Sequence, residues 1–309
     1  MSVDEEAEQR HPSTAALNMA AILYGAPPTQ EVVAGGRLTR VGARPPLGTY
    51  IKQLWQRRYF LVAEARAKAS NGTRENLLGK AWLILSPIVD GLTYFVIFGL
   101  ILDSDRRMEN FLGFLLIGVF LFSFTTRCLT GGARSVAGGR NLIRAFTFPR
   151  ASLPISVVLR ELFNMVPVLA ALFLLLVVIP PVEPWGLHTL LFLPVLALQV
   201  VFSAGLSLLF GRLCAAVPDL TQLISVAARL WMWGSGVMFP IADRVQDPTA
   251  LAILTGNPMF QVLDMARTVL IDGQVPASGS WITLAAWALG TFAVGFFIFW
   301  QAEESYGRA

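Results

Sequence analysis

Long apolar segments recur between residues 82 and 300 of this 309-residue chain, and they constrain its fold more than any other feature. Each is close to the length of about 20 residues that an α-helix needs to cross the hydrocarbon core of a bilayer. Hydrophobic residues make up 55% of the chain and charged residues only 14%, whereas soluble domains carry about 25% charged residues. Because a soluble fold could not bury so much apolar surface, the sequence predicts an all-α integral membrane protein.

We predict six membrane-spanning helices. The segment between the last two, residues 241–280, holds a short apolar run at Ala250–Thr255 and an amphipathic stretch at Met259–Ile271. Neither is long enough to span a membrane, so both are predicted to be re-entrant or interfacial helices on the outer side. The predicted spans are Trp82–Leu102, Phe111–Thr126, Ile155–Ile179, Leu187–Phe210, Leu220–Pro240 and Trp281–Trp300.

Ahead of the spans, the sequence predicts two further regions. Residues 1–49 mix acidic residues with Pro-Pro and Gly-Gly pairs, which is typical of a disordered tail. Residues 50–79 are predicted to form an amphipathic helix and a linker, and residues 80–309 the transmembrane domain. A basic amphipathic helix beside a first span usually lies in the membrane interface, although an ordinary soluble helix would show the same pattern.

Loop charges predict the orientation. The connection between spans two and three holds five arginines, at 127, 134, 140, 144 and 150, and no acidic residue, whereas the segment 241–280 holds four acids and two arginines. Basic loops stay in the cytoplasm. Both termini are therefore expected to face the cytoplasm, and the basic residues are expected to serve topology and not nucleic-acid binding.

The sequence holds no convincing catalytic, metal or cofactor site. It has two histidines, His11 and His188, and two isolated cysteines, Cys128 and Cys214, which match no metal motif. A phosphate-binding loop of the G-x-x-x-x-G-K-[ST] type is missing from the sequence. We expect a chain that is not an enzyme.

Charges inside the predicted spans are the first functional candidates, because an ionisable group in a membrane is costly and usually faces protein or water. Asp90 lies in span one and Arg229 in span five, beside Trp231 and Trp233. Arg229 either lies on the path of an anionic substrate, or pairs with Asp90 or reaches the interface. The adjacent Arg160-Glu161, near the start of span three, is expected at the membrane interface.

The cytoplasmic segment between spans two and three is the second candidate. It mixes apolar and basic residues after two Gly-Gly pairs, and such a short helix can insert into a groove of a partner protein. A plain basic loop that obeys charge topology is the alternative.

In order and spacing, these features resemble the ABC-2 family of transporter permeases over residues 50–302. The closest branch exports O-antigen, teichoic acid, capsule and related cell-envelope polysaccharides. The residues that carry the resemblance are the interfacial helix before Trp82-Leu83-Ile84-Leu85-Ser86-Pro87, Asn141-Leu142-Ile143, Phe148-Pro149-Arg150, Pro218-Asp219-Leu220, Gly236-Val237-Met238-Phe239-Pro240 and Asn257-Pro258.

The resemblance implies a multi-pass permease of the cytoplasmic (inner) membrane, built from two copies of the chain with two copies of an ABC ATPase subunit that carries ATP-Mg. The substrate would be a polyprenyl-diphosphate-linked glycan, and membrane lipids would surround the protein. The coupling segment would comprise Asn141, Leu142, Ile143, Arg144, Phe148, Pro149 and Arg150. The gate helix would hold Trp55, Arg57, Arg58 and Tyr59, and the translocation path Trp82, Asp90, Arg229, Trp231 and Trp233.

Two other functions fit the same topology. An ABC-2 permease for small lipophilic drugs would differ only in its substrate. An ATP-independent multi-pass transporter is the second alternative, but such proteins often carry internal repeats, and we find none in this sequence.

Overall fold

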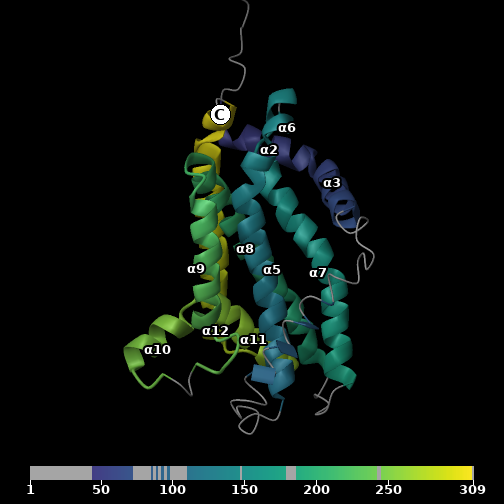
Figure 1. The fold of residues 1–309 in the computed structure, drawn as a ribbon, viewed down its shortest axis with the longest axis vertical. Coiled ribbons are helices and arrows are strands. Elements are labelled where there is room, and N and C mark those ends of the chain that lie inside the picture. Colours follow the sequence, from purple (N-terminus) through teal and green to yellow (C-terminus); the bar gives the residue numbers. More distant parts are fainter. Residues whose placement is uncertain are drawn as a thin grey trace, which may run out of the picture. The chain divides into compact units, whose positions relative to one another are not determined.

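The computed structural model describes residues 44–71, 85, 88–89, 92–93, 96–97, 110–146, 148–178, 186–241 and 245–307 (Figure 1). Regular structure in these ranges is helical throughout, which confirms the predicted all-α class. Within them, four helical segments are long and apolar enough to cross a membrane. They are α5 (Phe111–Gly138), α7 (Ser152–Val178), the 3-10 helix η3 (Leu187–Leu191) with α8 (Phe192–Ala216), and α12 (Ser278–Gln301).

Two of the six predicted spans are not among these four. The first, Trp82–Leu102, lies mostly outside the described residues. The fifth, predicted over Leu220–Pro240, is the 15-residue helix α9 (Leu220–Gly234), which at 1.5 Å per residue is about 22 Å long. It ends early because Gly236 adopts a left-handed conformation with φ of 67°, which a right-handed helix cannot include.

The predicted N-terminal helix over residues 50–70 is two helices, α2 (Leu47–Gln56) and α3 (Arg58–Asn71). They join at Arg57, whose backbone has φ of −91° and ψ of 5°. Most of the predicted 1–49 tail lies outside the described residues. Of its last part, residues 44–46 precede α2 and residues 47–49 form the start of that helix.

Helix α5 is longer than predicted. The sequence places its end at Thr126 and a loop after it, but the helix continues to Gly138. The Gly131-Gly132 pair, at which the sequence predicts a loop, lies inside the helix and permits close packing, of Gly131 against α7 and of Gly132 against α8. A Cβ atom on Gly132 would lie 2.6 Å from the Cα of Ser207. In the described part of the predicted connection between spans two and three, the residues outside α5 and α7 are Gly139, α6 (Arg140–Ala145) and those from Phe146 to Ala151.

Helix α8 lies at the centre of the bundle. It packs against α12 and α5, and α5 packs in turn against α7. Glycines allow the closest of these approaches, because a Cβ atom on Gly205 of α8 would lie 2.5 Å from the backbone nitrogen of Phe292 in α12. The main core cluster draws its buried side chains from α5, α7, α8, α11 and α12.

The two apolar pieces before the last span are helices, α10 (Pro248–Thr255) and α11 (Pro258–Leu270). Each begins with a capping side chain followed by proline, since Asp247 accepts from Ala250 N at 2.8 Å and Asn257 from Met259 N at 3.0 Å. Such starts satisfy backbone donors that a helix leaves free. Their re-entrant placement in a membrane stays a prediction.

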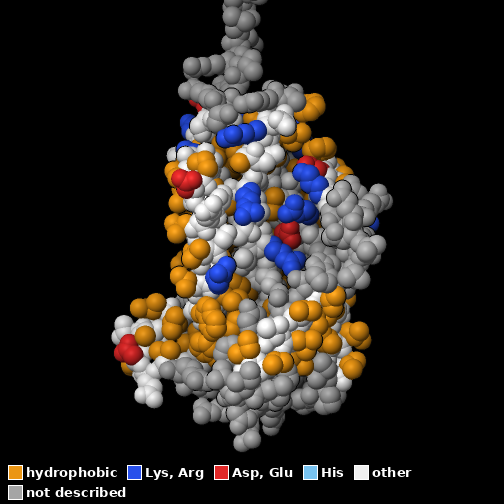
Figure 2. All heavy atoms as spheres, in the orientation of Figure 1, with side chains coloured by type: hydrophobic (Ala, Val, Ile, Leu, Met, Phe, Trp, Pro, Cys, Tyr) orange, Lys and Arg blue, Asp and Glu red, His pale blue; other side chains and the backbone are white. Residues whose placement is uncertain are grey.

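The bundle has two distinct ends (Figure 1). Helices α2 and α6 and the C-terminal 3-10 helix η4 (Glu303–Gly307) lie at one end, and α10 and α11 at the other. Figure 2 shows Lys and Arg side chains gathered on one face over the half nearer the first end, with hydrophobic side chains toward the second. The placement of the first end in the cytoplasm, which the charge rule predicts, stays a prediction.

Candidate functional site

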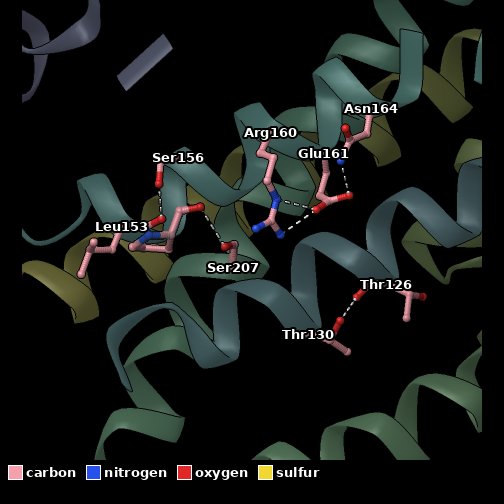
Figure 3. A network of polar contacts seen from close by, with 9 residues as sticks. Thr126, Thr130, Leu153, Ser156, Arg160, Glu161, Asn164 and Ser207 are labelled. Atoms are coloured by element: carbon pink, nitrogen blue, oxygen red, sulfur yellow. Dashed lines mark hydrogen bonds and ion pairs between the residues drawn. The ribbon is translucent and has the colours of Figure 1, made fainter. Parts of the chain in front are cut away.

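A polar cluster lies inside the bundle, on the face of α7 that turns toward α5 (Figure 3). Arg160 donates two hydrogen bonds to Glu161 Oε1, from Nε at 2.9 Å and from Nη2 at 2.7 Å, and Asn164 Nδ2 lies 3.5 Å from Glu161 Oε2. The Glu161 side chain is buried. The sequence predicts this pair at the membrane interface. It could not show that the Glu161 carboxylate lies between α5 and α7.

Next to this cluster is a hollow between α5 and α7, which we call the α5–α7 hollow. It is a shallow groove, partly open to the outside, with a volume of about 20 Å³ that water can reach. Arg127 lines the hollow. Arg160 does not line it but forms an ion pair with Glu161, which does. The lining residues are Phe120, Ser123, Phe124, Arg127, Glu161, Asn164, Met165 and Val168.

Hydroxyl groups of α5 add polarity at the same level (Figure 3). Thr130 Oγ1 donates to the carbonyl oxygen of Thr126 at 2.8 Å. The Thr126 hydroxyl oxygen is buried and has no hydrogen-bond partner among the described residues. A buried polar atom of this kind usually has a partner, but Thr126 does not line the α5–α7 hollow.

Helix α9 presents the predicted translocation residues in two ways. Arg229 and Trp233 are exposed. Trp231 is packed instead, because its Nε1 donates to Asn257 Oδ1 at 2.9 Å and its ring contacts Phe122 edge-on at 5.5 Å between centroids. Trp82 and Asp90 lie outside the described residues. A role for these five residues in translocation stays a prediction.

The predicted coupling segment forms α6 and the turn after it. Asn141 is exposed, Leu142 is partly buried, and Ile143 is buried in the core at the end with α2 and η4. Phe148, Pro149 and Arg150 are partly or fully buried, and Arg144 lies in α6. The sequence did not single out Phe146, which is 64% exposed at the end of α6.

A buried junction ties three distant segments together at this end. Tyr50 of α2 donates from its hydroxyl to Glu303 Oε2 at 2.8 Å, and Arg150 N donates to Glu303 Oε1 at 3.0 Å. Ala151 N donates to the Tyr50 hydroxyl at 3.0 Å, and the Arg150 guanidinium donates to the Glu303 carbonyl oxygen. Burial raises the pKa of Glu303, although these donors oppose the rise. The junction links α2, the end of the coupling segment and the C-terminus.

A basic groove lies beside the coupling segment. It has a volume of about 150 Å³ and lies between the end of α5, α6, the end of α8 and η4. Its basic residues are Arg140, which is exposed, and Arg212, whose guanidinium lies 5.8 Å from the ring centroid of Tyr306. The groove can receive acidic side chains of a partner.

The predicted gate helix exposes aromatic side chains. Trp55 is 67% and Tyr59 is 73% exposed, and the Arg58 guanidinium lies over both rings, at 4.8 and 4.3 Å. Arg57, at the junction of α2 and α3, is also exposed. Aromatic and basic side chains together suit the membrane interface, which keeps the interfacial assignment open as a prediction.

Sequence reasoning missed Arg267 of α11, which is buried near the second end. Its guanidinium donates to the carbonyl oxygens of Phe114, Gly236 and Val237 at 2.8 to 3.2 Å. A buried charge needs such partners. They are backbone atoms, so no side-chain pattern could have indicated the contact.

A metal centre has no support in the described ranges, where no group of three or more His, Cys, Asp or Glu side chains is placed to hold an ion. Both cysteines are buried free thiols.

Comparison with known proteins identifies the class. The profile of the family described as "ABC-2 type transporter" matches residues 65–271. The chain is 24% identical over 260 residues to the O-antigen export system permease protein RfbA of Myxococcus xanthus, which covers 84% of this chain and 98% of that protein. It is 25% identical over 205 residues to a protein of the same name from Klebsiella pneumoniae, covering 65% and 75%. It is 24% identical over 234 residues to the polysialic acid transport protein KpsM of Escherichia coli, covering 74% and 87%.

Proposed function

Because the chain belongs to the ABC-2 type transporter family, we propose that it is the membrane permease of an ATP-driven exporter of a polyprenyl-diphosphate-linked cell-envelope polysaccharide. One observation carries the proposal: a match along 98% of an O-antigen export permease. The names of the relatives, which concern O-antigen and polysialic acid, favour a glycan over small lipophilic compounds. This chain then transports and does not hydrolyse ATP.

The energy source in this proposal is a separate ABC ATPase subunit, present in two copies, which binds ATP-Mg and docks at the end with α6. The exposed side chains of Asn141 and Phe146 and the basic groove with Arg140 and Arg212 support this docking surface. Tyr50 and Arg150 both form hydrogen bonds to Glu303. A displacement of the coupling segment would therefore be transmitted through Glu303 to α2. A packed junction of this kind transmits movement better than a loose loop.

Two copies of the chain form the transport unit, with the polysaccharide passing between them. The outward face of α9 supports this arrangement, because Leu223, Val226 and Leu230 are all more than half exposed in the single chain. Arg229 on the same helix would face the anionic substrate, and the exposed Trp233 would stack on sugar rings. Closure of the ATPase would shift the coupling segment and widen the path.

Affinity purification in mild detergent tests the class. We expect an ATP-binding subunit to copurify with the permease, and the proposal fails if the purified chain alone supports export.

Labelling tests the orientation, which places the end with α6 and both termini in the cytoplasm of the inner membrane. In a variant that carries Asn141→Cys, with Cys128 and Cys214 replaced by serine, an impermeant maleimide is expected to react only in inside-out vesicles. Reaction only in right-side-out vesicles would reverse the orientation and remove the ATPase from this surface.

A further inference from the structure

The α5–α7 hollow lies away from both ends of α5 and is partly open to the outside. Arg127 follows the start of α5 at Phe111 by 16 residues and precedes its end at Gly138 by 11, or about 24 Å and about 16 Å along the helix axis. An ionisable group within a long apolar helix usually faces protein or water. Among the described residues, Arg127 has no hydrogen-bond or ion-pair partner.

The second arginine is restrained. Glu161 holds Arg160 through two hydrogen bonds, so this pair has no net charge, and among the described residues Arg127 adds one positive charge to the hollow. The Arg160 guanidinium approaches α5 where Gly131 has no side chain, since a Cβ atom there would lie 3.6 Å from Arg160 Nη2. Both guanidinium groups therefore lie at the boundary between α5 and α7.

The neutral lining completes a site for an oxyanion. Ser123 and Asn164 contribute polar groups to the hollow, and Phe120 and Phe124 are apolar parts of its lining. Arginine binds phosphate oxygens through paired N–H donors. A diphosphate that enters would bond first to Arg127 and would then compete with the Glu161 carboxylate for Arg160.

On this basis we propose that the α5–α7 hollow is a transient site for the diphosphate headgroup of the lipid-linked substrate. Arg127 is its primary ligand. Arg160 is a second ligand, which becomes available when its hydrogen bonds to Glu161 break. The inference rests on the proposed function, whose substrate carries a diphosphate. Because the Glu161 carboxylate competes with the headgroup for Arg160, the site binds the headgroup weakly. Weak binding suits a transporter, which must release its substrate.

Binding to the purified permease–ATPase complex in nanodiscs tests the site, with three probes: a polyprenyl diphosphate, the corresponding polyprenol and inorganic pyrophosphate. We expect Arg127→Gln to weaken polyprenyl diphosphate binding by about tenfold or more, the scale of one charge-assisted hydrogen bond. Arg134→Gln is the matched control. Arg134 lies two turns further along α5, is exposed and does not line the hollow, so the change there should be less than about twofold.

Glu161→Gln separates this site from a structural ion pair, because it frees Arg160. We expect tighter binding of polyprenyl diphosphate, by about threefold or more, with slower export because release is slower. A merely structural pair would give weaker or unchanged binding. Thermal unfolding of each variant shows whether the fold is kept, and Arg127→Lys, which retains the charge, should recover part of the affinity.

The probes separate the two sources of a diphosphate. The inference predicts that polyprenyl diphosphate binds more tightly than pyrophosphate, and that polyprenol binding does not respond to Arg127→Gln. Equal binding of pyrophosphate and the lipid would assign the site to the free anion and overturn the inference. If the wild type binds and exports the lipid-linked glycan but Arg127→Gln and Glu161→Gln change nothing, the site is wrong and the proposed function stands. If the wild-type complex neither binds nor exports it, both fail.

Discussion

Arg267 and Phe114 are joined by two hydrogen bonds and a ring contact. Arg267 Nε and Nη2 donate to the Phe114 carbonyl oxygen at 3.2 and 3.1 Å, and the guanidinium carbon lies 3.3 Å from the centroid of the Phe114 ring. The same side chain reaches the carbonyl oxygens of Gly236 and Val237, just after α9. One buried charge thus joins α11, the start of α5 and the end of α9.

Replacing Arg267 with leucine should destabilise the protein strongly, by about 3–5 kcal/mol, because it leaves buried carbonyl groups without donors. Thermal unfolding in detergent measures the effect. Lysine should recover only part of it, because its three donors share one nitrogen, whereas the guanidinium reaches the three carbonyl oxygens from separate nitrogens. The control is Arg66→Leu on the exposed surface of α3. A melting temperature for Arg267→Leu within about 2 °C of the wild type would contradict this role.

Contact between α8 and α12 depends on Gly205. Alanine there would bring Cβ to 2.5 Å from Phe292 N, and we expect a loss of about 1–3 kcal/mol from overpacking. Gly290 of α12 is the matched control, because a Cβ atom at that position would have nothing within 4 Å. Gly290→Ala should be neutral or stabilising by up to about 1 kcal/mol. Equal melting temperatures for the two variants would show that the close approach is not required.

Glu303 predicts a pH dependence of stability. Burial raises its pKa above the ordinary value of 4.5, and hydrogen bonds from Arg150 and Tyr50 only partly oppose this. A raised pKa means that the folded state binds the proton more tightly than the unfolded state, so stability falls as pH rises from 4.5 through the folded pKa. Glu303→Gln has no such titration. Melting curves should show the wild type losing stability relative to Glu303→Gln between about pH 4 and pH 8, and a relative gain over that range would contradict the sign.

Two phenylalanines beside α6 should behave differently. Phe146 is exposed, whereas Phe148 packs against the core at the end with α2 and η4. We expect Phe146→Ala to reduce permease-stimulated ATP hydrolysis by about fivefold or more without changing the melting temperature, as for a contact residue at an interface. Phe148→Ala should lower the melting temperature. If Phe146→Ala hydrolyses ATP and exports like the wild type, Phe146 does not contact the ATPase.

The sequence predicted the helices that coincide with long uninterrupted apolar segments. Helix α7, predicted over Ile155–Ile179, spans Ser152–Val178, and α12, predicted over Trp281–Trp300, spans Ser278–Gln301. Composition alone is enough for such segments, since no soluble fold accommodates them.

What the sequence could not predict depends on contacts between distant segments. Gly131-Gly132 indicated a loop, because local propensity does not register that α7 packs against Gly131 and α8 against Gly132. Tyr50 and Glu303 lie 253 residues apart, and nothing in either local pattern indicates their hydrogen bond. In the α5–α7 hollow, the sequence identified Arg160-Glu161 as a pair but not its proximity to Arg127.

Transport by a reconstituted system tests the central claim most directly. Proteoliposomes that contain the permease and its ATPase subunit would be loaded with a polyprenyl-diphosphate-linked glycan, and its appearance in the opposite leaflet would be followed with and without ATP-Mg. The account predicts transfer that requires the permease, the ATPase subunit and ATP together. Transfer by the permease without ATP, or ATP-driven movement of small lipophilic compounds with no movement of the glycan, would contradict it.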